Sequence, residues 1–96
     1  MTDTITQEKM VRYLAITTEA IAKVKIAPEQ KIEWKAAAED FLDMAQRYLS
    51  DAKHFAQKGD LVNAFAAVNY AHGWLDAGAR LGLFDVGHDS RLFTVD

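Results

Sequence analysis

The stretch from Phe55 to Val86, FAQKGDLVNAFAAVNYAHGWLDAGARLGLFDV, contains the clearest turn, the broadest apolar helix and the clearest helix end in the chain. Gly59 can adopt the left-handed conformation that ends a helix without a steric penalty from a Cβ atom. Asp60 can then accept a hydrogen bond from a free N–H group in the first turn of the next helix. This dipeptide therefore predicts the end of one helix and the start of another, and the remaining helices are placed outward from it.

The apolar residues after this turn predict a helix over residues 60–81. At about 100° per residue, one face of that helix gathers Leu61, Ala64, Phe65, Val68, Ala71, Leu75 and Ala79. We expect this face to be the core seam, where the alanines allow a neighbouring helix to approach closely, and we expect the helix to contact both other helices. Gly82 predicts its end, and Leu83 and Phe84 are expected to fold back over that end.

Two further amphipathic helices are predicted before the turn. Apolar residues recur at three- and four-residue steps over residues 4–25. An apolar heptad continues through residues 29–58 and consists of Trp34, Ala38, Phe41, Ala45, Tyr48, Ala52 and Phe55. Pro28 separates these helices, because proline disfavours helix in the residue before it and fits the first turn after it. The sequence therefore predicts an all-α protein, a single domain over residues 1–96 that forms a three-helix up-down-up bundle with a short tail over residues 82–96.

Composition limits the class of protein and its surroundings. The chain has 96 residues, 50% of them hydrophobic, and it has no cysteine, so it can form neither a disulfide framework nor a thiolate nucleophile. The N-terminus is polar and no segment approaches the length of an apolar membrane span, so we expect a cytoplasmic protein with no membrane association. A formal net charge of −3, with interspersed signs, makes nucleic-acid binding an unfavoured interpretation.

Several short segments of the chain are similar to a known family. They are YLSDA at residues 48–52, KGD at 58–60, NAF at 63–65, YAHGWLDAG at 70–78 and LGLFD at 81–85. Together they resemble a family of short archaeal proteins catalogued as domain of unknown function 357. The resemblance implies a small helical bundle, and because the family has no assigned activity, it implies no chemistry.

His72 and Asp76 are the candidate polar site. They lie one helical turn apart, a spacing at which an imidazole and a carboxylate can share a metal ion or a hydrogen bond. No HExxH motif and no matching Glu-x-x-His pair on another helix accompanies them, so we expect a boundary histidine, with Asp76 free to pair with Arg80 instead. We expect no catalytic residue, metal or cofactor, and the acidic group of Glu39, Asp40 and Asp43 is expected to be solvated, with Asp43 paired to Arg47.

A second stripe on the helix over residues 60–81 is a candidate interface. Relative to Leu61, it lies at about 160–220°, whereas the predicted seam centres near 320°. It consists of Tyr70, Trp74, Ala77 and Leu81. Aromatic residues among small ones are suited to anchoring a partner or a second copy of the chain. The alternative is that Trp74 is covered within the same chain, by the first helix or by the tail.

The sequence thus favours a protein-interaction or self-associating module, such as a dimer, over the alternative of an uncharacterised enzyme or nucleic-acid-binding helical domain.

Overall fold

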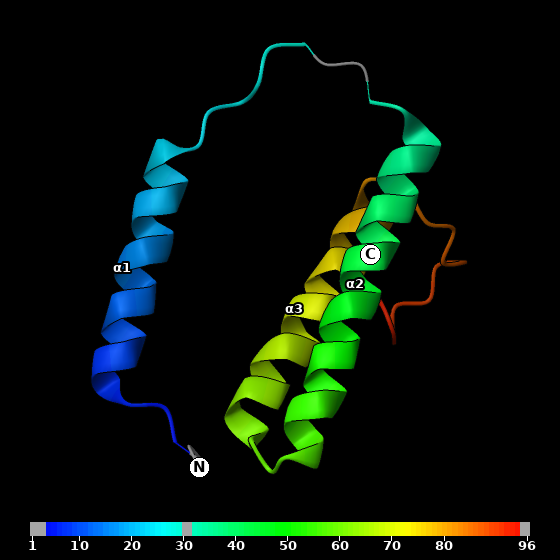
Figure 1. Ribbon diagram of the computed structural model, residues 1–96. Helices are drawn as coiled ribbons and strands as arrows, with labels where there is room; N and C mark the ends of the chain where they lie inside the picture. The colour runs from blue at the N-terminus through cyan, green and yellow to red at the C-terminus, as the bar shows by residue number, and fades with distance from the viewer. Residues whose placement is uncertain (1–3, 30–31, 95–96) are drawn as a thin grey trace.

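The computed structural model describes residues 4–29 and 32–94, which form three α-helices and no strand. Helix α1 spans Gln7–Lys23, α2 spans Trp34–Gln57 and α3 spans Leu61–Arg80 (Figure 1). Residues 81–94 form a succession of turns after α3. The predicted all-α class, with three helices followed by a short tail, is confirmed.

Capping residues make the first two helices shorter than predicted. Thr6 precedes α1, and its side chain accepts a hydrogen bond from an N–H group of the first turn. Glu33 precedes α2 and accepts a hydrogen bond from the Lys35 N–H at 3.3 Å, so α2 begins at Trp34 rather than at residue 29. Residues 30 and 31 of the predicted second helix lie outside the described residues, as do residues 1–3 and 95–96.

The turn between α2 and α3 has the predicted chemistry. Gly59 has a φ of 77°, and its N–H group donates to the Ala56 carbonyl at 3.0 Å. The N–H group of Asp60 donates to the Phe55 carbonyl at 2.9 Å, which completes a Schellman motif at the end of α2. The Asp60 side chain accepts from the Asn63 backbone N–H at 3.2 Å and caps α3. The three-residue connection makes α2 and α3 an antiparallel hairpin.

The end of α3 repeats this geometry. Gly82 also has a φ of 77°, its N–H group donates to the Ala79 carbonyl at 3.1 Å, and the Leu83 N–H donates to the Gly78 carbonyl at 2.8 Å. The ring of Phe84 lies where a Cβ atom on Gly78 would be, so the chain folds back over the last turn of the helix. The predicted stop at Gly82 and the return of Phe84 are confirmed.

Small residues make the contact between α2 and α3. The residues buried there are Ala45 and Ala52 of α2 with Ala67 and Ala71 of α3, whereas Gly78, also buried, lies under the ring of Phe84. Side chains the size of alanine allow two helix backbones to approach closely. The heptad predicted for α2 therefore faces α3, because Ala45 and Ala52 belong to it.

The contact face of α3 differs from the predicted seam. Leu61 and Phe65, which helical spacing placed on the predicted seam, are 64% and 69% exposed. The buried line of Ala67, Ala71 and Gly78 lies about 60° around the helix from the predicted seam centre. Apolar residues occur on nearly every side of α3, so the smallness of one stripe, and not the size of another, selects the face that α2 covers.

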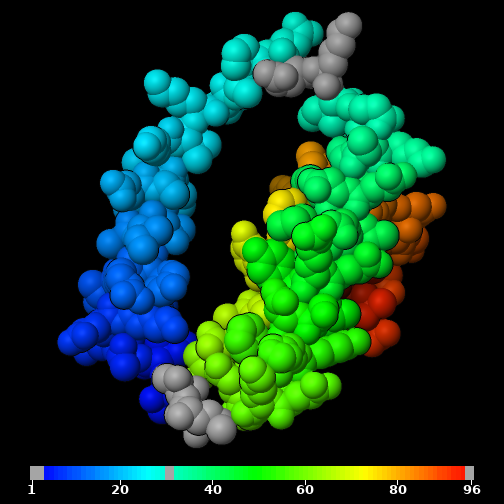
Figure 2. Space-filling view, viewed as in Figure 1, coloured from blue at the N-terminus to red at the C-terminus, as the bar shows by residue number. Residues whose placement is uncertain are grey.

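Helix α1 stands apart from the hairpin. None of its residues is buried, and within residues 4–29 and 32–94 the only close helix packing joins α2 to α3. Figures 1 and 2 show an open frame, with α1 on one side and the hairpin on the other. The N-terminal end of α1 comes nearest, where Ile5, just before the helix, and Met10 share a shallow hollow with Val62 and Phe65 of α3. The expected contact of α3 with both other helices is therefore not seen: α3 packs on α2 alone.

The segment after α1 explains this separation. Val24 has extended backbone with φ −65° and ψ 135°, and Glu33 before α2 is also extended, with φ −78° and ψ 114°. Pro28 disfavours helical geometry at Ala27. The chain therefore leaves α1 as an extended segment rather than as a tight turn, and it does not bring α1 onto the hairpin.

No helix in the described part of the chain combines the length and the apolar character needed to cross a lipid bilayer.

Replacing Gly59 tests the turn. Gly59→Val should lower the free energy of unfolding by about 1–2 kcal/mol, because a β-branched side chain is strained at positive φ. Urea unfolding measures the effect, and Gln57→Val, at an exposed helical position two residues earlier, is the matched control. Equal losses in the two variants would show that the left-handed conformation is not what the turn requires.

The cap of α3 should make stability depend on pH. Hydrogen bonds from the side chain and then the backbone N–H of Asn63 hold the pKa of Asp60 below its ordinary value of 3.8. The ionised cap therefore stabilises the fold above that value, and this contribution is lost as pH falls through the lower folded pKa. Asp60→Asn keeps an acceptor at the cap but cannot titrate. In urea unfolding, the stability advantage of the wild type over this variant should shrink in acid; a constant difference would contradict the assignment.

Candidate functional site

Aromatic residues from two helices lie together on one flank of the hairpin, where Tyr70 is exposed and Phe41, Tyr48 and Trp74 are partly buried. Phe41 of α2 lies edge-on to Trp74 of α3, with ring centroids 4.9 Å apart and an interplanar angle of 89°. Tyr48 of α2 and Tyr70 of α3 make the same kind of contact one turn earlier on α3, with ring centroids 4.4 Å apart and an interplanar angle of 88°. Tyr70 and Trp74 are themselves 6.5 Å apart. These edge-to-face contacts join α2 and α3 beside their small-residue contact and hold the rings in defined orientations.

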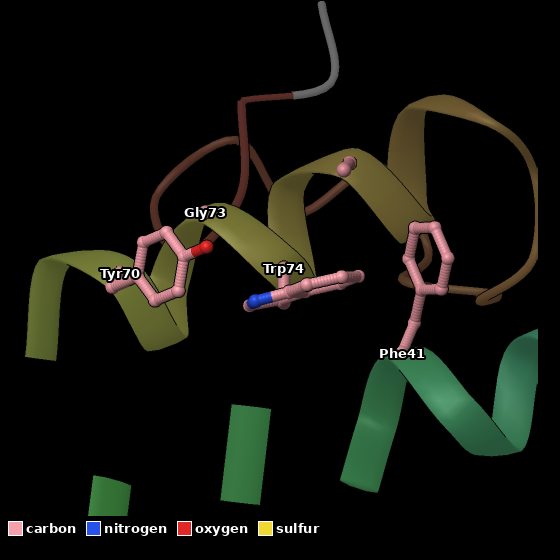
Figure 3. A pocket seen from close by; sticks show the side chains of 5 residues that line it. Phe41, Tyr70, Gly73 and Trp74 are labelled. Carbon is pink, nitrogen blue, oxygen red and sulfur yellow. The ribbon is translucent and has the colours of Figure 1, made fainter. Parts of the chain in front are cut away.

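The rings surround a shallow hollow of about 320 Å³. Phe41, Tyr70, Gly73, Trp74 and Ala77 line it, and Figure 3 shows Phe41 approaching Trp74 from the facing helix. We call these five residues the aromatic surface. The Tyr70 hydroxyl is the only ionisable group among them, so the hollow is suited to holding an apolar or aromatic group. Apart from that hydroxyl, the lining residues contain no side-chain group that could act as an acid, a base or a metal ligand.

Gly73 keeps the floor of this hollow open. A Cβ atom built there would meet no other atom within 4 Å, in contrast to Gly78 one and a half turns later, whose place against Phe84 has no room for one. Glycine inside a helix costs about 0.5–1 kcal/mol relative to alanine. Packing within this chain therefore does not explain the glycine at position 73.

The structure brings together three of the four predicted interface residues. Tyr70, Trp74 and Ala77 line the hollow, and Tyr70 is 54% exposed. Leu81 follows on the same side as the C-terminal cap residue of α3, 58% exposed, and does not line the hollow. Sequence reasoning placed Phe41 and Tyr48 in the core heptad of α2 and missed that they support this surface. The matching spacing of aromatic residues on the two helices was the available signal.

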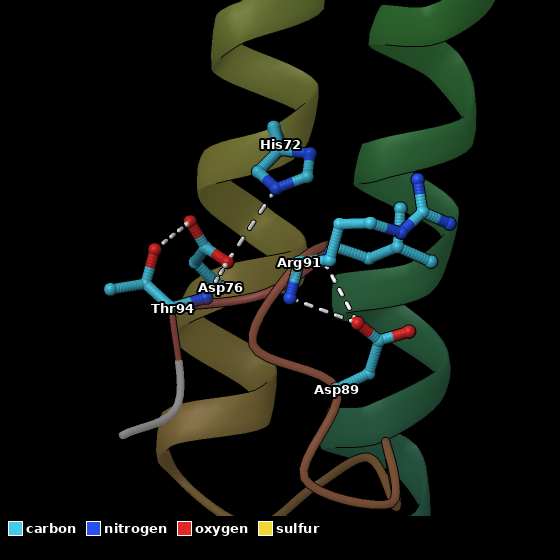
Figure 4. Close-up of polar contacts among 6 residues, drawn as sticks. His72, Asp76, Asp89, Arg91 and Thr94 are labelled. Atoms are coloured by element: carbon cyan, nitrogen blue, oxygen red, sulfur yellow. Dashed lines mark hydrogen bonds and ion pairs between the residues drawn. The ribbon is translucent and has the colours of Figure 1, made fainter.

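His72 and Asp76 hold the C-terminal segment. The two oxygens of the Asp76 carboxylate accept hydrogen bonds from the Thr94 N–H at 3.0 Å and the Thr94 hydroxyl at 3.3 Å (Figure 4). His72 Nε2 lies 3.6 Å from the same carboxylate, and its ring stacks on Phe93 with centroids 6.3 Å apart. Asp76 therefore faces Thr94 and His72 rather than Arg80, and the pair has a structural use as a clasp for the tail.

The remaining candidates show ordinary surface chemistry. Asp43 and Arg47 form the predicted pair at 2.8 Å, with both side chains more than half exposed. Among residues 4–29 and 32–94, no group of three or more histidine, aspartate or glutamate side chains is placed to hold a metal ion. The aromatic surface is therefore the part of this site that other residues of the described chain do not fully cover.

The fold and site define a small all-α protein built on a helical hairpin with an exposed aromatic surface. The family model described as protein of unknown function (DUF357) matches residues 12–84, and the chain belongs to this family. The match begins within α1 and ends at Phe84, so it contains the whole hairpin and the aromatic surface. The predicted family resemblance is confirmed. No curated protein and no solved structure matches the chain.

The two glycines of α3 should respond in opposite ways to the same change. Gly73→Ala should raise the free energy of unfolding by about 0.5–1 kcal/mol, because it gains helix propensity in open space. Gly78→Ala should lower it by about 1–3 kcal/mol, because the added methyl group displaces the ring of Phe84. Thermal or urea unfolding of the two variants measures both effects, and changes of the same sign would contradict this description of the helix.

Proposed function

We propose that this protein is an interaction module that binds a protein partner, or another copy of itself, through the aromatic surface. The observation that carries the proposal is the half-exposed ring of Tyr70 beside the partly buried ring of Trp74, both held by edge-on contacts with Tyr48 and Phe41 around an open hollow. Tyrosine and tryptophan are the residues most enriched where protein interfaces concentrate their binding energy.

The fixed orientation of the rings supports binding in a second way. A side chain that is already ordered loses little conformational freedom when a partner arrives, and this reduces the entropic cost of association. The supporting contacts come from α2, so the surface is prepared by the hairpin itself. Gly73 leaves space between the rings that an apolar side chain of the partner would fill.

We place this activity in the cytoplasm, on the absence of cysteine from a chain of 96 residues. The alternative, an enzyme or a nucleic-acid-binding domain, gains no support from His72 and Asp76, whose contacts are with the C-terminal segment. The interaction proposal therefore rests on the aromatic surface alone.

Site-specific photo-crosslinking in the native host tests the proposal. A photoreactive phenylalanine analogue at Leu81, at the rim of the aromatic surface, should give a discrete cross-linked product that contains a partner protein or a second copy. The analogue at Ser50, which is exposed on the outer side of α2, is the matched control. Adding Tyr70→Glu should abolish the product while leaving the melting temperature within a few degrees. Equal products from both positions, or none from Leu81, would refute the function.

A further inference from the structure

The opposite flank of the hairpin carries a long apolar groove. One hollow is lined by Leu42, Leu49, Val68 and Leu75, and a second by Leu49, Leu61, Phe65 and Val68. Because the two hollows share Leu49 and Val68, they form one groove along the boundary of α2 and α3. We call these six leucine, valine and phenylalanine residues the apolar groove. Phe65 and Leu61 are 69% and 64% exposed there, although the N-terminal end of α1 approaches Phe65 from the same chain.

Helix α1 carries an apolar face that packing within the chain does not bury. Met10, Tyr13, Leu14 and Ile21 share one face at helical spacing, and their exposed fractions run from 49% to 72%. The helix has 17 residues, including several β-branched ones, and an isolated helix of that length is marginal in water. Since α1 buries none of its residues in its own chain, its helical state requires a surface that covers this face.

The exposed area indicates how much contact is missing. The chain has an accessible surface of 8160 Å² for a mass of 10.7 kDa. A compact monomer of this mass exposes about 5,500 Å². The radius of gyration is 16.0 Å, against about 12–13 Å for a compact domain of this length. The excess is on the order of 2,600 Å² per chain, or about 5,200 Å² for two chains, which lies at the upper end of the roughly 2,000–5,000 Å² that both partners of an obligate homodimer bury together.

We propose that two copies of this chain exchange their α1 helices, so that the apolar face of each α1 lies in the apolar groove of the other copy. A second copy supplies both a helix and a groove, and so covers both open surfaces of the first in one two-fold arrangement. Any other single helix would cover the groove and leave α1 exposed. The extended backbone at Val24 and Glu33 holds α1 away from its own hairpin and leaves it free to reach another.

This contact uses a different flank of the hairpin from the aromatic surface. On α3 the groove residues lie at about 320–40° and the aromatic residues at about 160–220°, on either side of the line that α2 covers. The exchange therefore goes beyond the proposed function, and the two can fail separately. A dimer formed through α1 leaves Tyr70 and Trp74 available to another protein.

Sedimentation equilibrium of the full chain is the first test. The wild type should have about twice the monomer mass of 10.7 kDa. Leu14→Glu, on the apolar face of α1, and Val68→Glu, in the groove, should each reduce the mass to that of one chain. Ala15→Glu, on the polar side of α1, and Tyr70→Glu, on the aromatic surface, should remain dimeric. A monomeric wild type, or a Leu14→Glu variant that stays dimeric, would overturn the exchange.

Cross-linking between marked copies distinguishes exchange from a helix that closes on its own chain. The protein has no cysteine, so Leu14→Cys in a tagged copy and Val68→Cys in an untagged copy each introduce one reactive thiol. After the copies are unfolded and refolded together, a short bismaleimide should join tagged to untagged chains. Ser50→Cys in place of Val68→Cys should give no such product. A bond formed only within a chain that carries both Leu14→Cys and Val68→Cys would overturn the proposal, whatever the effect of the glutamate variants on folding.

Discussion

The close approach of α2 and α3 is the constraint on which the rest of the structure depends. The centre of the contact is made by alanines, namely Ala45, Ala52, Ala67 and Ala71. Such a contact line has no room for large side chains, so they must lie to either side of it. The aromatic pairs of Phe41 with Trp74 and Tyr48 with Tyr70 occupy one flank, and the apolar groove occupies the other. Both open surfaces of the hairpin are consequences of one narrow line of small residues.

This arrangement buries little for a chain of this length. No large side chain among the described residues is fully buried, and the buried core consists of alanines. A small core of this kind supplies little hydrophobic stabilisation, since that contribution grows with the apolar area removed from water. The two flanks differ in how far contacts within the chain order and cover them. The aromatic flank is already ordered by contacts within the hairpin, whereas the groove and α1 each lack a covering surface.

Local chemistry explains what the sequence predicted well and where it fell short. Gly59, Asp60 and Gly82 determine the turn and both helix ends through backbone geometry that depends on a few neighbouring residues. The contact face of α3 depends on which of several apolar stripes α2 covers, and the spacing that gathered Leu61 and Phe65 on one face suggested the wrong stripe. Amphipathic periodicity shows that α1 has an apolar face, but it contains no information about which molecule covers that face.

Helical spacing likewise predicted some features of the candidate sites and not others. Helical spacing placed Tyr70, Trp74 and Ala77 on one stripe, and they line one hollow. The contribution of Phe41 depends on how α2 and α3 are aligned, which periodicity within one helix does not specify. The spacing of His72 and Asp76 indicated a pair but not its use, because Thr94 lies eighteen residues further along the chain.

The short turn at Gly59 also has a kinetic consequence. Because α2 and α3 are adjacent in sequence and joined by three residues, most contacts of the hairpin have low sequence separation, and chains rich in such contacts fold in microseconds to milliseconds. The clasp between Asp76 and Thr94 closes only a short loop and adds little delay. Helix α1 has no packing partner among these contacts, so the hairpin can complete its collapse without waiting for the N-terminal third of the chain. Helix α1 is synthesised before the hairpin but takes no part in the contacts that form it.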